Sequence, residues 1–226
     1  MSEDNGIKLI LLGMSGTGKT NIINALIDKP FDNNSESTLA SSFVNKNLII
    51  NKKNYQIEIW DTAGQEMYKS LTKMFIIDSK IVIFVYDITQ RASFQELDFW
   101  IKAAKDPLGD APIYAIFGNK KDLYLNEQVE EEEGKIKADE IGAYFRLTSG
   151  KSERENLNQY INELVELYDK KYGQNIGGKK GNYMNSFSLQ NDKKIKINKK
   201  EVVVINEFIF QDYIIFLLVI HFLYYK

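Results

Sequence analysis

The stretch GMSGTGKT, residues 13–20, follows directly after the apolar run IKLILL, residues 7–12. Its spacing is G-x-x-x-x-G-K-[ST], in which glycines let backbone N–H groups curl around an anion and the next helix adds its positive end. Lys19 would then reach the terminal phosphates and the Thr20 hydroxyl would bind Mg²⁺. A glycine-rich turn with a solvated lysine is the alternative, but an apolar strand precedes the loop and helical spacing follows it in NIINALI, residues 21–27. The predicted nucleotide contacts in this loop are Ser15, Gly16, Thr17, Gly18, Lys19 and Thr20.

Composition limits the classes of protein to which the chain can belong. Its 226 residues suit one α/β domain with a tail, or at most two small domains, and 44% hydrophobic residues support an ordinary core. The net charge of −2 gives no argument for nucleic-acid binding. Cysteine is absent, which excludes disulfides, thiolate metal sites and lipids attached through sulfur. The acidic, polar start MSEDNG is not a secretory signal.

Apolar runs typical of strands alternate with stretches typical of helices. The runs at 81–88 and 113–119 are nearly continuous, as in central parallel strands covered on both faces. The runs at 41–50 and 54–60 flank a polar turn and predict an antiparallel hairpin. The other expected strands are 7–13 and 143–149, and the expected helices are 19–27, 67–78, 92–105, 133–141 and 153–171. This order predicts an α/β fold with a six-stranded, mostly parallel sheet and five flanking helices, whose ligands bind beyond the carboxyl ends of the strands.

The stretch DTAGQ, residues 61–65, follows one of these predicted strands. Asp61 can hold Mg²⁺ through water, the Gly64 N–H can bind a terminal phosphate, and Gln65 can orient an attacking water. The same letters also make a good turn. We therefore assign catalytic and metal roles here only together with the phosphate loop.

The stretch NKKD, residues 119–122, follows the buried run at 113–119. A carboxylate at Asp122 can accept two hydrogen bonds from guanine, a donor pair that adenine lacks. A site of this kind rejects the wrong base by up to about 10⁴-fold or more. Asn119 would bond the other edge of the base, and the stem of Lys120 would cover its face. Alone NKKD is more often a solvated turn, but after a buried strand and about 100 residues beyond a phosphate loop it predicts GTP rather than ATP.

Two weaker stretches complete the predicted site. In TSGK, residues 148–151, backbone amides of Ser149 and Gly150 would face the guanine oxygen, and the stem of Lys151 would pack on the ring. The polar stretch at 30–43 carries Thr38, whose hydroxyl can complete the Mg²⁺ shell only when a γ-phosphate is present. An ordinary long loop is the alternative, although a loop of this length in a compact domain is usually functional.

Taken together, these residues resemble the Ras superfamily of small GTPases, and most closely the Rab family. The resemblance covers about residues 6–172 and rests on GMSGTGKT, Thr38, IWDTAGQE (59–66), NKKD and TSGK in the family's order. It implies the P-loop NTPase fold of small G proteins and a Mg²⁺-dependent cycle between GTP and GDP. It also implies that Phe31 packs edge-on against the guanine. SLTKMF (70–75), VYDIT (85–89) and RASFQELDFW (91–100) are also similar to Rab sequences.

The sequence departs from the family pattern at two stretches and one single residue. The first switch reads Thr38-Leu39-Ala40 where TIG is usual, and FIIDS, residues 75–79, replaces an aromatic pair followed by Arg-Gly. Both changes affect partner selectivity more than nucleotide binding. Gly150 replaces the usual alanine, and since only its backbone N–H is needed we expect little loss of affinity.

Arginine is scarce in this chain: Arg91, Arg146 and Arg154 are its three arginines, and none lies in the phosphate loop or a switch. Without an arginine finger in cis we expect slow intrinsic hydrolysis, on the order of 10⁻⁴–10⁻³ s⁻¹ as in the related Ras protein. An activating protein that donates an arginine would add several powers of ten. Tight GDP binding would likewise require an exchange factor.

Four segments are expected along the chain: a tail at 1–6, the GTPase domain at 7–172, a flexible basic linker at 173–200 and an apolar segment at 201–226. The cleanest apolar run, 213–225, would span about 20 Å as a helix, short of the roughly 30 Å membrane core. A tail anchor, an unnatural end such as read-through of non-coding sequence, and an extra buried or partner-binding segment all stay open.

The sequence thus predicts a monomeric, Rab-like GTPase switch in vesicle traffic on the cytosolic face of endomembranes. Effectors, an exchange factor and an activating protein would bind residues 31–45 and 62–79, which GTP would order, and the C-terminal segment would provide membrane association. A GTP-bound scaffold that hardly cycles is one alternative. A Ras- or Ran-like signalling GTPase without a trafficking role is another.

Overall fold

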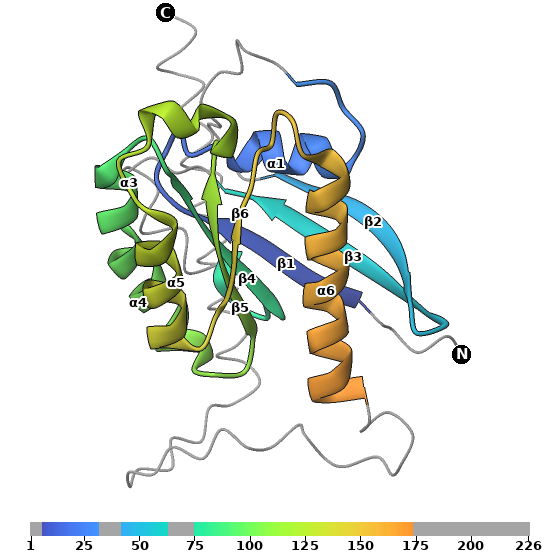
Figure 1. Cartoon of the computed structure of the whole chain (residues 1–226). Helices are drawn as coiled ribbons and strands as arrows, with labels where there is room; N and C mark the ends of the chain where they lie inside the picture. Colours follow the sequence, from blue (N-terminus) through green and yellow to red (C-terminus); the bar gives the residue numbers. More distant parts are fainter. Residues whose placement is uncertain (1–5, 32–41, 63–74, 174–226) are drawn as a thin grey trace, which may run out of the picture. The chain divides into compact units, whose positions relative to one another are not determined.

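The computed structural model describes residues 6–31, 42–62 and 75–173, which contain a six-stranded sheet in the order β2-β3-β1-β4-β5-β6 (Figure 1). β2 runs antiparallel to β3, and the other neighbouring strands are parallel. The strands are β1 (Gly6–Leu12), β2 (Ser42–Ile50), β3 (Lys53–Asp61), β4 (Ile81–Asp87), β5 (Ile113–Asn119) and β6 (Tyr144–Leu147). The predicted sheet and its antiparallel hairpin are confirmed.

The β2–β3 hairpin turns on two residues, Asn51 and Lys52, between the paired Ile50 and Lys53. Both turn residues have positive φ angles, 51° and 66°. Such a turn matches the right-handed twist of the flanking strands. The hairpin register is therefore fixed locally.

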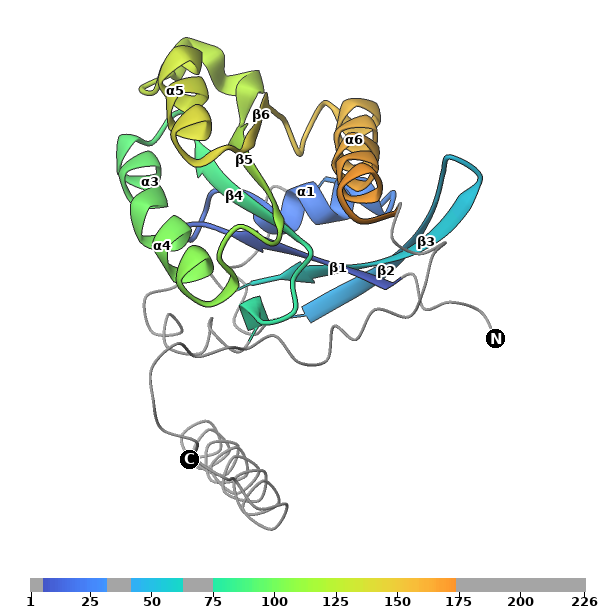
Figure 2. The same cartoon turned by 90° about the horizontal axis from the view of Figure 1, so that it is seen from below.

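Helices cover both faces of the sheet (Figure 2). One face carries α1 (Lys19–Leu26) and α6 (Arg154–Tyr172), and the other carries α3 (Arg91–Gln95), α4 (Leu97–Leu108) and α5 (Glu131–Ile141). Every residue of β4 is buried. This two-sided burial explains why the central strands appear in the sequence as continuous apolar runs.

Two predicted helices differ in detail from the observed ones. The single helix expected at 92–105 is divided into α3 and α4, which meet at Glu96. α5 begins at Glu131 rather than 133, because Glu130 and Glu133 form a capping box. The helix expected at 67–78 lies largely outside the described residues.

The sequence also predicts one apolar stripe on the helix at 153–171, formed by Leu157, Tyr160, Ile161, Leu164, Leu167 and Tyr168, and this stripe is only partly confirmed in α6. Leu157, Ile161 and Leu164 are buried, but Leu167 is 38% exposed, whereas the carboxylate residue Asp169 is buried. Asp169 accepts hydrogen bonds from Lys53 Nζ and Tyr55 Oη of β3, at 2.8 and 2.5 Å. These bonds offset the cost of burying a charge in place of an apolar side chain.

The parallel strands place their carboxyl ends at one edge of the sheet, where the loops at 13–18, 61–62, 119–122 and 148–151 begin. This is the edge at which open α/β sheets bind ligands. Among the residues that the structure describes, no helix is both long enough and apolar enough to cross a membrane.

Candidate functional site

The loop between β1 and α1 depends on two glycines. Gly13 has φ +151°, and a Cβ there would lie 2.1 Å from the carbonyl oxygen of Val85. Gly18 has φ +91°, and a Cβ there would lie 2.4 Å from Asn119 Nδ2. Thr17, which is fully buried, donates from Oγ1 to the Met14 carbonyl at 2.9 Å. The loop is thus packed directly against the ends of β4 and β5.

Lys19 is the first residue of α1, and its ammonium lies inside the loop. Nζ donates to the carbonyl oxygens of Gly13 and Met14 at 2.7 and 2.9 Å. Burial lowers the pKa of Lys19 to about 8, and the nearby carboxylates of Asp61 and Glu96 oppose that shift. Without a ligand the buried ammonium is stabilised by hydrogen bonds to these carbonyl oxygens. A phosphate at this position would stabilise its positive charge more strongly.

Two of the predicted magnesium ligands lie side by side. Thr20 Oγ1 donates to Asp61 Oδ2 at 2.8 Å, and Asp61 is 5% exposed. A hydroxyl and a carboxylate are oxygen donors of the kind that Mg²⁺ prefers, with waters and phosphate oxygens filling the rest of its shell. The donor set therefore fits this ion. The predicted residues Thr38, Gly64 and Gln65 lie outside the described residues.

The Asn119 side chain joins three loops at the edge of the sheet. Nδ2 donates to the carbonyl of Thr17 at 2.8 Å, and Oδ1 accepts from the Gly150 N–H at 3.1 Å and from Thr148 Oγ1 at 3.3 Å. Asn119 is only 2% exposed. One amide thus connects the phosphate loop with the NKKD and TSGK stretches.

Asp122 lies on the exposed side of the same edge. Its Oδ1 accepts a hydrogen bond from Ser149 Oγ at 2.6 Å, and the same hydroxyl accepts bonds from the backbone N–H groups of Lys151 and Ser152. Lys151 Nζ lies 5.6 Å from the centre of the Phe31 ring. The structure thus brings together the residues predicted to contact the base.

Gly150 fits a narrow space beside α1. A Cβ at this position would lie 3.0 Å from backbone atoms of Asn21 and Ile22. Its N–H is the group that binds Asn119 Oδ1. In this structure the partner of that N–H is thus Asn119, whereas the sequence predicts that it faces the guanine oxygen. Glycine keeps this N–H and avoids the tight contact that an alanine Cβ would make.

Sequence reasoning missed one charged residue at this edge. Asp87 ends β4, and its Oδ2 lies 2.7 Å from Lys120 Nζ. The available signal was positional, because Asp87 follows a buried run just as Asp61 and Asn119 do.

Three aromatic residues outside the predicted nucleotide contacts form a separate cluster. Phe43 stacks on Trp60 with ring centres 5.0 Å apart, and Phe75 lies 6.0 Å from Trp60. Lys8 Nζ lies 4.7 Å from the Trp60 ring centre. Phe43 is 51% exposed.

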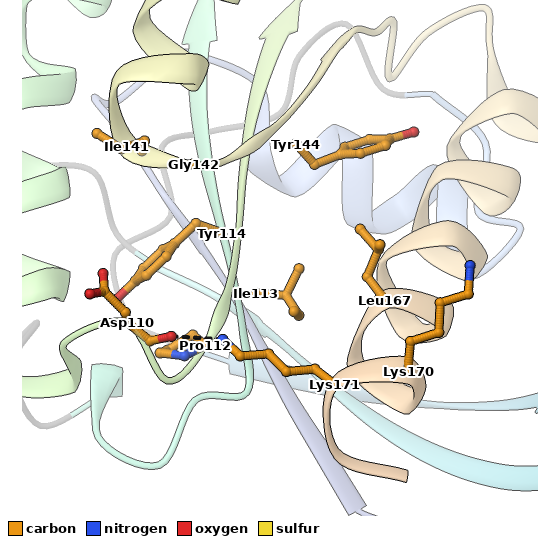
Figure 3. Close-up of a pocket in the computed structure, with 10 residues that line it drawn as sticks. All are labelled: Asp110, Pro112, Ile113, Tyr114, Ile141, Gly142, Tyr144, Leu167, Lys170 and Lys171. Atoms are coloured by element: carbon orange, nitrogen blue, oxygen red, sulfur yellow. Dashed lines mark hydrogen bonds between the residues drawn. The ribbon is translucent and has the colours of Figure 1, made fainter. Parts of the chain in front are cut away.

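A cavity of about 620 Å³ lies at the amino end of β5, the opposite end of that strand from Asn119 (Figure 3). Ile113 and Tyr114 of β5 and Leu167 and Lys171 of α6 contribute to its wall. None of the predicted site residues that the structure describes lines it. This cavity is therefore separate from the candidate nucleotide site.

Comparison with known proteins agrees with this geometry. The family model described as the Ras family matches residues 8–170. The Ras-related protein Rab5A of Oryza sativa subsp. japonica is 38% identical over 159 residues, which cover 70% of this chain and 78% of that protein. The family match includes the phosphate loop, the strand-end loops and nearly the whole sheet, from within β1 to beyond β6. The chain therefore belongs to the Ras family of small GTPases and is similar to Rab proteins; it uses Mg²⁺, binds GTP and hydrolyses it to GDP.

Proposed function

We propose that the nucleotide binds across the carboxyl edge of the sheet, with Lys19 on the terminal phosphates, Thr20 and Asp61 at the magnesium ion, and Asn119 and Asp122 at the guanine. The observation that carries this proposal is the Asn119 side chain, which bonds both the phosphate loop and the TSGK loop. The two ends of one nucleotide would therefore bind loops that are already joined. Ser149 holds the Asp122 carboxylate beside them.

A nucleotide-selectivity experiment tests the assignment of Asp122. We expect wild-type protein with Mg²⁺ to prefer GDP over ADP by about 10⁴-fold, the scale for a polar partner that the bound base would bury and that the wrong base would leave unpaired. Asp122→Ala should remove most of that preference. Asp98→Ala is the matched control, because Asp98 is an exposed carboxylate of α4 paired with Lys137 at 3.0 Å. Equal binding of ADP and GDP by wild-type protein would contradict the assignment.

The hydrolytic step would use Gln65 to orient water, with an arginine from an activating protein. Each arginine of the chain is engaged elsewhere: Arg91 with Glu133, Arg146 with Glu163, and Arg154 with Asp28 and the Lys29 carbonyl. In single-turnover assays Gln65→Leu should slow hydrolysis, and replacing any of the three arginines by lysine should leave the rate within about twofold. An unchanged rate in Gln65→Leu would favour a scaffold that hardly cycles.

The aromatic cluster of Phe43, Trp60 and Phe75 is the surface that we propose for effectors. Phe43 follows the segment that carries Thr38, and Phe75 follows the segment that carries Gly64 and Gln65. Exposed aromatic side chains are typical anchors of protein interfaces. Phe43→Ala should weaken effector binding and leave GDP affinity unchanged.

A role in vesicle traffic at endomembranes would follow from the similarity to a Rab protein. Membrane association would use the C-terminal segment, residues 201–226. Localisation of the full chain and of a 1–200 truncation tests both points. Membrane localisation that the truncation loses supports them, whereas diffuse staining of both forms would contradict them.

A further inference from the structure

We propose that Asp87 is a positioning residue that sets how long the guanine nucleotide stays bound, acting through Lys120. This inference rests on the proposed nucleotide site. It adds a residue from β4, a strand that contributes nothing to the predicted contact set.

The carboxylate of Asp87 is held rigidly at the end of β4. It is 4% exposed, and its Oδ1 accepts hydrogen bonds from the N–H and Oγ1 of Thr89 at 2.9 and 2.7 Å. The Asp87 N–H donates to Ser93 Oγ at 2.9 Å, and Ser93 is fully buried. The orientation of Oδ2 is therefore fixed before Lys120 reaches it.

Lys120 reaches Asp87 from the neighbouring strand. β4 and β5 are paired so that Asp87 lies opposite Asn119, and Lys120 follows with φ +67°, the left-handed conformation. Its Nζ lies 2.7 Å from Asp87 Oδ2, although a third of the side chain is exposed. The ion pair therefore directs the lysine stem along the edge of the sheet instead of into solvent.

The ion pair between Asp87 and Lys120 is not explained by a contribution to folding stability. Burying a carboxylate and an ammonium costs about as much as their attraction returns, so such pairs contribute little net stability. Asp87 already has two hydrogen bonds from Thr89. What the pair does supply is a fixed direction for the Lys120 stem, which is proposed to cover the face of the base.

The expected effect follows from pre-organisation. Immobilising one long side chain on binding costs the equivalent of about 2- to 13-fold in affinity. A lysine that is already immobilised avoids that cost. Breaking the ion pair with Asp87 would free the Lys120 side chain, and GDP should then dissociate about 3- to 10-fold faster.

Release of a fluorescent GDP analogue from the full chain, with Mg²⁺ present, tests the proposal. Asp87→Asn keeps the shape and the acceptor for Thr89 but removes the charge, and it should release GDP about 3- to 10-fold faster. Lys120→Met keeps the apolar stem without the charge and should have a similar effect. The double variant should be no faster than Lys120→Met alone. Asp98→Asn, which breaks the surface pair with Lys137, is the control and should release GDP at the wild-type rate.

Two results would overturn the proposal: wild-type release in Asp87→Asn, or effects of the two substitutions that multiply in the double variant. If Asp87→Asn does not fold, wild-type release in Lys120→Met overturns it alone. A failure of the nucleotide site itself is separable, because Asp122→Ala would then leave base preference unchanged. If Asp122→Ala abolishes that preference while Asp87→Asn has no effect, only the role of Asp87 is wrong.

Discussion

Asn119 should contribute to the stability of the empty protein as much as to the binding of the base. Asn119→Ala removes three hydrogen bonds from a side chain that is 2% exposed, and it leaves the Thr17 carbonyl and the Gly150 N–H without that partner. A net hydrogen bond contributes about 1 kcal/mol, and a buried polar group left unsatisfied costs about 1–3 kcal/mol. We therefore expect the free energy of unfolding to fall by about 3 kcal/mol.

Asp122→Ala provides the matched comparison. Asp122 is exposed, and its carboxylate accepts the one side-chain hydrogen bond from Ser149. Its removal should cost less than about 1 kcal/mol of stability. The same substitution should nevertheless cost far more than Asn119→Ala in the preference for guanine over adenine.

Urea unfolding of nucleotide-free protein in EDTA measures this difference. Nucleotide must be absent, because ligand that binds the folded state adds its own stabilisation and would mask a change in the protein. The slopes of the two variants should equal that of the wild type, so that the midpoints report stability directly. Equal losses of unfolding free energy in the two variants would refute the view that Asn119 joins the loops before nucleotide arrives.

Two further outcomes follow from other contacts. Gly13→Ala should show no cooperative thermal transition, because its Cβ would lie 2.1 Å from the Val85 carbonyl oxygen and prevent folding. Gly16→Ala has no atom of the described residues within 4 Å of its Cβ, so it should fold and lose only about 1–2 kcal/mol for its positive φ. Cooperative thermal transitions with the same midpoint in both variants would contradict this view. Hydrogen bonds from Lys53 and Tyr55 hold the pKa of Asp169 below its ordinary value, so its stabilisation is complete above about pH 5 and is lost as the pH falls below about 4. Asp169→Asn should cost about 1–3 kcal/mol at pH 7 and less at pH 3, and a loss that urea unfolding finds equal at both pH values would contradict this explanation.

The features that the sequence predicted well are those whose cause is local. The phosphate loop needs glycines at fixed spacing, and the close approaches of Gly13 to Val85 and of Gly18 to Asn119 explain two of them. Continuous apolar runs identified the central strands because burial on both faces leaves no polar alternation. The candidate residues follow such runs, and the carboxyl ends of parallel strands lie at one edge of the sheet. The sequence therefore predicted correctly that the described candidates lie close together there.

The features that the sequence did not predict depend on distant partners. The lysine of NKKD was expected to cover the base, but its ion pair with Asp87 requires the pairing of β4 with β5. Helical periodicity placed Leu167 in the core and gave no reason to bury Asp169, because the donors to that carboxylate come from β3. The roles of all the candidate site residues stay predictions, and Thr38, Gly64 and Gln65 also lie outside the described residues.

Binding and hydrolysis make different demands on this chain. Asn119 joins the loops that we propose for the base and the phosphates, so we expect the protein to hold a nucleotide with its own groups. Charge that develops during phosphoryl transfer needs additional cations at the phosphates. Lys19 is the one cation within residues 13–20, and all three arginines have acidic partners elsewhere in the fold. Moving one of them to the phosphates would break an existing ion pair, so an arginine from a second protein is the simpler source. We therefore expect the bound GTP to persist until a partner supplies that arginine.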